Sequence, residues 1–80
     1  MKKPRTRTRR YLEITDLGNG RSTKIPTEGS QWHSTLARIA RATLGAADPD
    51  NCASVAKSLL GGEQIRTSFF HYCVTTRPPL

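Results

Sequence analysis

Two histidines are the side chains of this sequence best suited to proton transfer. His33 and His71 could form an acid–base pair for RNA cleavage, because imidazole titrates near neutral pH and a neighbouring arginine or lysine could stabilise phosphate charge. A plainer interpretation is that His33 packs at the edge of a helix face and His71 is an ordinary strand residue. Two histidines among 80 residues is close to chance. We therefore expect no enzyme and keep a small ribonuclease as the second alternative.

The two cysteines, Cys52 and Cys73, form no CxxC motif. These cysteines and the two histidines could in principle form a Cys2His2 zinc site. Their spacing fits no usual zinc-ligand pattern, because His71 and Cys73 are separated by a single residue. In a reducing compartment two buried cysteines are usually inert, whereas secretion would allow a disulfide between them. We expect no metal and no cofactor.

A glycine-rich segment from Gly18 to Lys24 has the residue types of a phosphate-binding loop. It does not fit the GxxxxGK[ST] pattern, and no helix is expected directly after it. The dipeptide Asn19-Gly20 instead predicts a two-residue type I′ hairpin turn, in which both residues need a positive φ. We assign the glycines to this turn.

Positive charge is concentrated at the N-terminus. The net charge is +7, and residues 1–10 hold six bases and no acid, which gives +6. The other residues hold seven bases and six acids, which gives +1. A one-sided basic segment is typical of binding to phosphate backbones or to an acidic protein face, although a solubilising tail is the alternative.

The arginines of this segment follow a period of two. Arg5, Arg7 and Arg9 would share one face of an extended chain with Tyr11, and the threonines between them favour a strand. Basic termini are usually mobile, so a flexible arm is the alternative.

Residues 11–26 are predicted to form a β-hairpin, because polar and apolar residues alternate before the Asn-Gly turn. A two-residue turn would pair Ile14 with Ile25. The core face would then carry Leu12, Ile14 and Ile25. The opposite face, for solvent or a ligand, would carry Tyr11, Glu13, Thr15 and Lys24.

Residues 30–44 are predicted to be an amphipathic helix with Ser30 as its N-cap and Gly45 after its end. Its apolar stripe comprises Trp32, Leu36, Ile39, Ala40 and Leu44.

Residues 49–60 are predicted to be a second helix, capped by Asp48 and ended by Gly61 and Gly62. Its apolar stripe comprises Cys52, Val55, Ala56, Leu59 and Leu60. The short link between the helices predicts a helical hairpin. Acids in the first turn of the second helix disfavour a DNA-reading helix-turn-helix.

Residues 64–75 are predicted to be the last strand, apolar on both faces. The order of elements predicts an α+β fold, a small ββααβ two-layer domain with a three-stranded antiparallel sheet and the helical hairpin on one face. The expected organisation is a basic N-terminal arm at 1–10, a single α+β domain at 11–77 and a C-terminal tail at 78–80. An exposed edge strand could pair with the same strand of a second copy, so a homodimer formed by strand addition is an alternative.

The candidates for binding are the bases of the N-terminal arm and the charged and aromatic residues on the uncovered sheet face. Tyr11 and Lys24 are expected on that face, to which the last strand adds either Arg66, Phe70 and Tyr72 or its alternate residues. Aromatic rings among bases on an open sheet could stack and neutralise single-stranded nucleic acid, whereas burial in the core is the plainer role for such rings. The candidate residues are Arg5, Arg7, Arg9, Arg10, Tyr11, Lys24, Arg66 and Tyr72, with Arg38 and Arg41 as a second patch.

The small size of the chain favours binding over catalysis, because a modest core leaves little room for a catalytic pocket. We expect a non-enzymatic basic binding or inhibitor protein that occupies an acidic protein surface or a nucleoprotein complex. Direct binding of RNA or single-stranded DNA by the open sheet face is the first alternative. Short basic chains without a catalytic motif are common among phage-encoded inhibitors, including anti-CRISPR proteins. We expect a protein of this class because the class is common, and no motif in the sequence identifies it.

No apolar stretch follows the basic start. This pattern predicts no signal peptide, no contact with a membrane and a cytoplasmic location.

Overall fold

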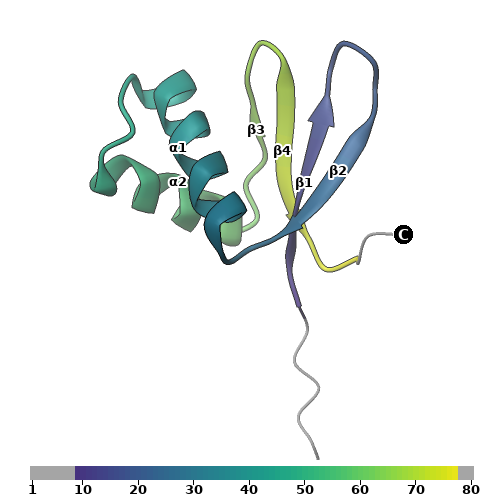
Figure 1. Ribbon diagram of the computed structural model, residues 1–80, viewed down its shortest axis with the longest axis horizontal. Helices are drawn as coiled ribbons and strands as arrows, with labels where there is room; N and C mark the ends of the chain where they lie inside the picture. Colours follow the sequence, from purple (N-terminus) through teal and green to yellow (C-terminus); the bar gives the residue numbers. More distant parts are fainter. Residues whose placement is uncertain (1–8, 78–80) are drawn as a thin grey trace, which may run out of the picture.

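The computed structural model describes residues 9–77, which form two layers. Four antiparallel strands make one sheet in the order β2-β1-β4-β3, and two helices pack on one of its faces (Figure 1). The elements are β1 (Tyr11–Asp16), β2 (Ser22–Pro26), α1 (Ser30–Leu44), α2 (Pro49–Leu60), β3 (Ile65–Arg66) and β4 (Phe70–Thr75). The predicted α+β class is confirmed, whereas the predicted three-stranded sheet has four strands.

The first hairpin closes through a four-residue loop, residues 17–20, and the predicted two-residue turn is wrong. The backbone N–H of Asp16 donates to the carbonyl of Arg21 at 2.8 Å, which closes the loop. The Asp16 carboxylate accepts from the N–H of Gly18 at 2.7 Å and so stabilises the start of the longer loop. Gly20 has a φ of 75°, but Asn19 has a negative φ, which a type I′ turn would not allow.

The longer loop shifts the register of β1 and β2 by two residues. Leu12, rather than Ile14, pairs with Ile25, and Ile14 pairs with Thr23. Side chains alternate between the faces of a strand, so a shift of two leaves every residue on its predicted face. Leu12 and Ile25 are accordingly buried beneath the helices.

The predicted last strand, residues 64–75, is in fact a second hairpin made of β3 and β4. Ile65 pairs with Tyr72, and Arg66 pairs with His71. The chain reverses between Thr67 and Phe70, where the Thr67 hydroxyl bonds to both the N–H and the carbonyl of Phe70 at 3.2 Å. A threonine that bonds to backbone in this way competes with continued pairing, and the strand breaks.

Both helices have their predicted bounds, with one change at a cap. Asp48 caps α2 by accepting from the N–H of Asn51 at 2.8 Å. Ser30 is not the cap of α1, because the helix includes Ser30 and Gly29 occupies the N-cap position without a side-chain bond. Gly45 ends α1 with a φ of 85°.

The core lies between the helices and the covered face of the sheet. Its buried members are Leu12, Ile25, Trp32, Leu36, Ile39, Ala40, Val55, Leu59 and Tyr72. Leu44 and Leu60, both predicted to belong to apolar helix stripes, are exposed instead. Each is the last residue of its helix, so its side chain lies at the margin of the packed layer.

Candidate functional site: a groove at the hairpin tips

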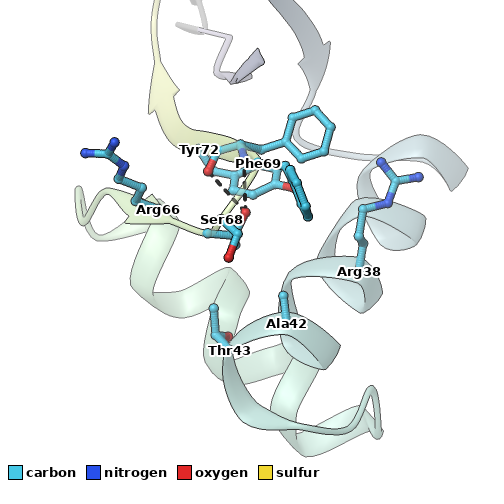
Figure 2. Close-up of a pocket in the computed structure, with 9 residues that line it drawn as sticks. Arg38, Ala42, Thr43, Arg66, Ser68, Phe69 and Tyr72 are labelled. Carbon is cyan, nitrogen blue, oxygen red and sulfur yellow. Dashed lines mark hydrogen bonds between the residues drawn. The ribbon is translucent and has the colours of Figure 1, made fainter. Parts of the chain in front are cut away.

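A groove of about 660 Å³ lies between α1 and the turn that joins β3 to β4. It is lined by Arg38, Ala42, Thr43, Arg66, Thr67, Ser68, Phe69, Phe70 and Tyr72. Figure 2 shows Ala42 and Thr43 on α1 at one side, with Phe69 and Tyr72 at the other. The groove thus lies where a helix faces the end of a hairpin.

The second hairpin presents Phe69 at its tip. Three hydrogen bonds between Thr67 and Phe70 close the turn, two of them through the Thr67 hydroxyl and one from the Thr67 N–H at 2.8 Å. Ser68 and Phe69 are left as the two turn residues, and the Phe69 side chain is 73% exposed. The exposed ring at the tip of the turn is accessible to a partner, so Phe69 is a candidate contact residue.

Two aromatic rings form the inner side of the groove. Phe70 and Tyr72 project from the same face of β4, with ring centroids 6.1 Å apart. Tyr72 is only 1% exposed. Burial raises the pKa of the Tyr72 phenol, and the positive charge of Arg38 offsets part of that rise.

Two arginines border the groove, and none of the residues that line it is acidic. Figure 2 shows Arg38 on α1 and Arg66 on β3 at opposite sides, with the Arg66 side chain directed away from Arg38. Arg38 also borders a second groove of about 380 Å³, between α1 and the strands β1 and β2. Arg38 is therefore the cation common to both hollows, and Arg66 marks the outer rim of the first.

The tips of the two hairpins are tied together. The N–H of Leu17, in the first hairpin loop, donates to the carbonyl of Phe69 at 2.9 Å. Leu17 is 38% exposed, so a second partly exposed apolar residue is joined through its backbone to the tip that carries Phe69. The result is an apolar tip next to a groove bordered by arginines. We call Leu17, Phe69, Arg38, Arg66 and the remaining lining residues the tip site.

The uncovered face of the sheet differs from the predicted aromatic platform. Its central row is Lys24, Glu13 and Cys73, which pair across β2, β1 and β4. Tyr72 lies on the other face, under the helices, because it pairs with Ile14 rather than with Thr15. The prediction that Tyr72 stacks on a ligand at the uncovered face is therefore wrong, and Tyr11 is the candidate aromatic that remains there.

The surroundings of Cys73 on this face raise the pKa of its thiol. Burial raises the pKa of the Cys73 thiol, and the Glu13 carboxylate, whose Oε1 accepts from Sγ at 3.7 Å, raises it further. Lys24, on the far side of Glu13, acts in the opposite direction. This arrangement disfavours the thiolate that a nucleophilic cysteine needs.

The basic arm begins at the end of the sheet opposite the tip site. Arg10 precedes β1, and its guanidinium donates to the Leu60 carbonyl at the end of α2 at 3.0 Å. Such a bond satisfies a helix-terminal carbonyl and places positive charge at the negative end of the helix. Arg10 thus has a structural role as well as its predicted binding role. Arg9 is exposed, and Arg5 and Arg7 lie outside the described residues.

The other predicted site residues lie apart from one another. Arg41 is exposed on α1 but does not line the groove that Arg38 borders. His33 is exposed on α1, whereas His71 lies on the uncovered face and bonds to Gln64 at 3.0 Å. The sheet separates these histidines, so the predicted acid–base pair is not assembled.

The two cysteines are also separated by the sheet, since Cys52 belongs to α2 and Cys73 to the uncovered face; both are free. Within residues 9–77 there is no group of three or more histidine, cysteine or acidic side chains placed to hold a metal ion. In the same part of the chain, neither helix has the length and apolar character needed to cross a bilayer.

The sequence pointed to Arg38 and Arg66 but not to the apolar tip beside them. The strand predicted over residues 64–75 would include Phe69, whereas the structure places Phe69 in the turn between β3 and β4. One signal was available, because Thr67-Ser68 interrupts the apolar residues of this segment and both residue types favour turns. Comparison with known proteins adds nothing to this picture, since the chain matches no protein-family model, no curated protein and no solved structure.

Proposed function

We propose that this chain is a non-enzymatic binding protein that occupies an acidic surface of a protein or nucleoprotein partner. The observation that carries the proposal is the tip site, where an exposed apolar tip adjoins a groove with two arginines and no acid. Interfaces are built around such apolar and arginine anchors. The net charge of +7 extends the same preference for acidic partners to the whole chain.

The lining of the groove supports binding rather than catalysis. It offers arginines, hydroxyls and rings, but it contains no histidine, cysteine or carboxylate that could serve as a general base or nucleophile. The Thr67 hydroxyl is already bonded to the backbone of Phe70. Such a surface would inhibit its partner by occupying a site that other molecules need.

Direct binding of single-stranded nucleic acid is the second candidate, and one observation favours it. The exposed ring of Phe69 lies in a groove with two arginines, an arrangement that could stack a base and neutralise its phosphate. The aliphatic side chain of Leu17 at the same tip has no comparable role with nucleic acid and is better suited to a protein.

A salt titration tests the proposal. Fluorescent polyglutamate, a short single-stranded DNA and a short duplex would each be titrated with the full-length protein and with a version lacking residues 1–8. This truncation keeps Arg10, whose bond to Leu60 belongs to the fold. We expect binding to polyglutamate that weakens as salt rises, with a smaller salt dependence in the truncated protein.

Each outcome has a definite meaning. Absence of binding to all three polyanions at low salt would refute the proposal. Salt-sensitive binding to single-stranded DNA alone would replace it with the second candidate.

A further inference from the structure

We infer that the groove between α1 and the β3–β4 turn binds an acidic segment of a partner protein, with one large apolar side chain of that segment inserted between Arg38 and Phe69. This inference rests on the proposed function and names the kind of partner that the tip site recognises. It makes binding depend on particular residues, whereas the basic arm alone would attract any polyanion.

The volume of the groove limits the size of the group that can bind in it. About 660 Å³ falls within the range of pockets that enclose a small molecule, so one large side chain with its flanking backbone would fill it. The inner side is apolar, formed by the rings of Phe70 and Tyr72 with Ala42 opposite. An apolar anchor is therefore the part of the ligand that the interior favours.

Charge defines what must flank the anchor. Arg38 and Tyr72 line the same groove, so the positive charge of Arg38 faces the groove that the buried ring of Tyr72 closes on its inner side. Arg66 lies at the opposite rim, and its side chain points outward (Figure 2). With no lining acid to compensate these cations, carboxylates on both sides of the anchor would complement them.

The tip itself favours a protein over a nucleic acid. The backbone hydrogen bond between Leu17 and Phe69 places two exposed apolar residues at neighbouring positions of the hairpin tips. A protein surface can bury both side chains at once, and contacts of this kind often dominate the binding energy. A nucleic acid would use the ring of Phe69 for stacking and leave Leu17 in water.

Selection from a random peptide-display library tests the inference without presupposing a sequence. The full-length protein would be the bait, and the double variant Arg38→Ala, Phe69→Ser would remove peptides that bind elsewhere. We expect the enriched peptides to share one aromatic or large aliphatic residue flanked by Asp or Glu. No enrichment, or enrichment of sequences without this pattern, would overturn the inference.

Affinity measurements on the most enriched peptide then locate the site. Arg38→Ala and Phe69→Ser should each weaken binding by roughly tenfold or more, as for central interface residues. Lys57→Ala removes the same charge from an exposed position on α2, outside the groove, and should change affinity by less than about twofold. Replacing the apolar residue of the peptide with serine should weaken binding to the unmodified protein by roughly tenfold.

Two results would separate this inference from the proposed function. If Arg38→Ala and Lys57→Ala weaken binding equally while polyglutamate still binds in a salt-dependent way, the groove is not the site and the general proposal stands. If single-stranded DNA competes for the groove and needs Arg38 and Phe69 as the peptide does, the occupant is a nucleic acid and the inference is overturned. Failure of polyglutamate and of all selected peptides to bind would refute both.

Discussion

The backbone N–H of Leu17 donates a 2.9 Å hydrogen bond to the carbonyl of Phe69 and so joins two hairpin tips that lie 52 positions apart in sequence. This bond continues the pairing of β1 with β4 past Asp16 and Phe70. The bond thereby joins the backbones of two residues with exposed apolar side chains at one end of the sheet. A fixed geometry of this kind reduces the entropy lost when a partner binds.

Substitution of Phe69 should separate binding from stability. Phe69→Ser removes a side chain that is 73% exposed, so the free energy of unfolding in urea should change by less than about 0.5 kcal/mol. Affinity for an acidic peptide should fall by roughly tenfold or more. A large loss of stability would show that Phe69 is a packing residue and would remove the basis for the tip site.

Substitution of Thr67 should loosen the tip while leaving the core intact. Thr67→Val keeps the side-chain shape but removes the hydroxyl that bonds to the N–H and carbonyl of Phe70. We expect a destabilisation of about 1 kcal/mol and faster hydrogen exchange at the Phe70 amide. Unchanged exchange would mean that the Thr67 hydroxyl does not hold the turn.

Tyr72 should make the protein less stable at alkaline pH. Burial raises the pKa of Tyr72 above its ordinary value of 10.0, an effect that Arg38 partly opposes. The folded state therefore favours the neutral phenol, and this contribution to stability is complete below pH 10 and is lost as the pH rises through the higher folded pKa. Urea unfolding at a series of pH values should show this loss in the unmodified protein.

The matched variant for that experiment is Tyr72→Phe, which keeps the ring and removes the ionisable group. Its free energy of unfolding should fall less steeply above pH 10 than that of the unmodified protein. Equal slopes in the two proteins would contradict the assigned burial of the phenol.

Cys73 should react slowly with thiol reagents, and its two charged neighbours should tune the rate in opposite directions. In a Cys52→Ser background, Glu13→Gln should speed alkylation at pH 8 by roughly two- to tenfold, because loss of the carboxylate lowers the pKa of Cys73. Lys24→Ala should slow the reaction, because Lys24 favours the thiolate. Changes of the same sign in both variants would point to altered exposure of the thiol.

Much of the fold follows from local rules that the sequence displays. Helix bounds depend on nearby caps such as Asp48 and Gly45, and the face of each β1 residue depends on alternation alone. The register of the first hairpin differs from the prediction because the Asp16 carboxylate stabilises a longer loop than Asn-Gly usually forms. The error was two residues, so the assignment of faces was unaffected.

The site was harder to predict because it depends on contacts between distant segments. Arg38 and Arg66 are 28 positions apart, and they border one groove because the fold places α1 opposite the β3–β4 turn. The misplaced residue, Tyr72, lies in a strand with apolar side chains on both faces, and the sequence of that strand does not reveal which face the helices cover. In the structure Tyr72 pairs with Ile14, so its side chain lies on the face that the helices cover.

The most direct test of the account is to map by NMR where an acidic peptide binds on the full-length, isotope-labelled protein. The peptide would carry one tryptophan flanked by glutamates, and a peptide with serine in place of the tryptophan would be the control. The account predicts the largest shift changes at the amides of Leu17, Ala42 and Phe69, all reduced with the control peptide. Changes centred on Glu13 and Cys73, or equal effects of the two peptides, would contradict it.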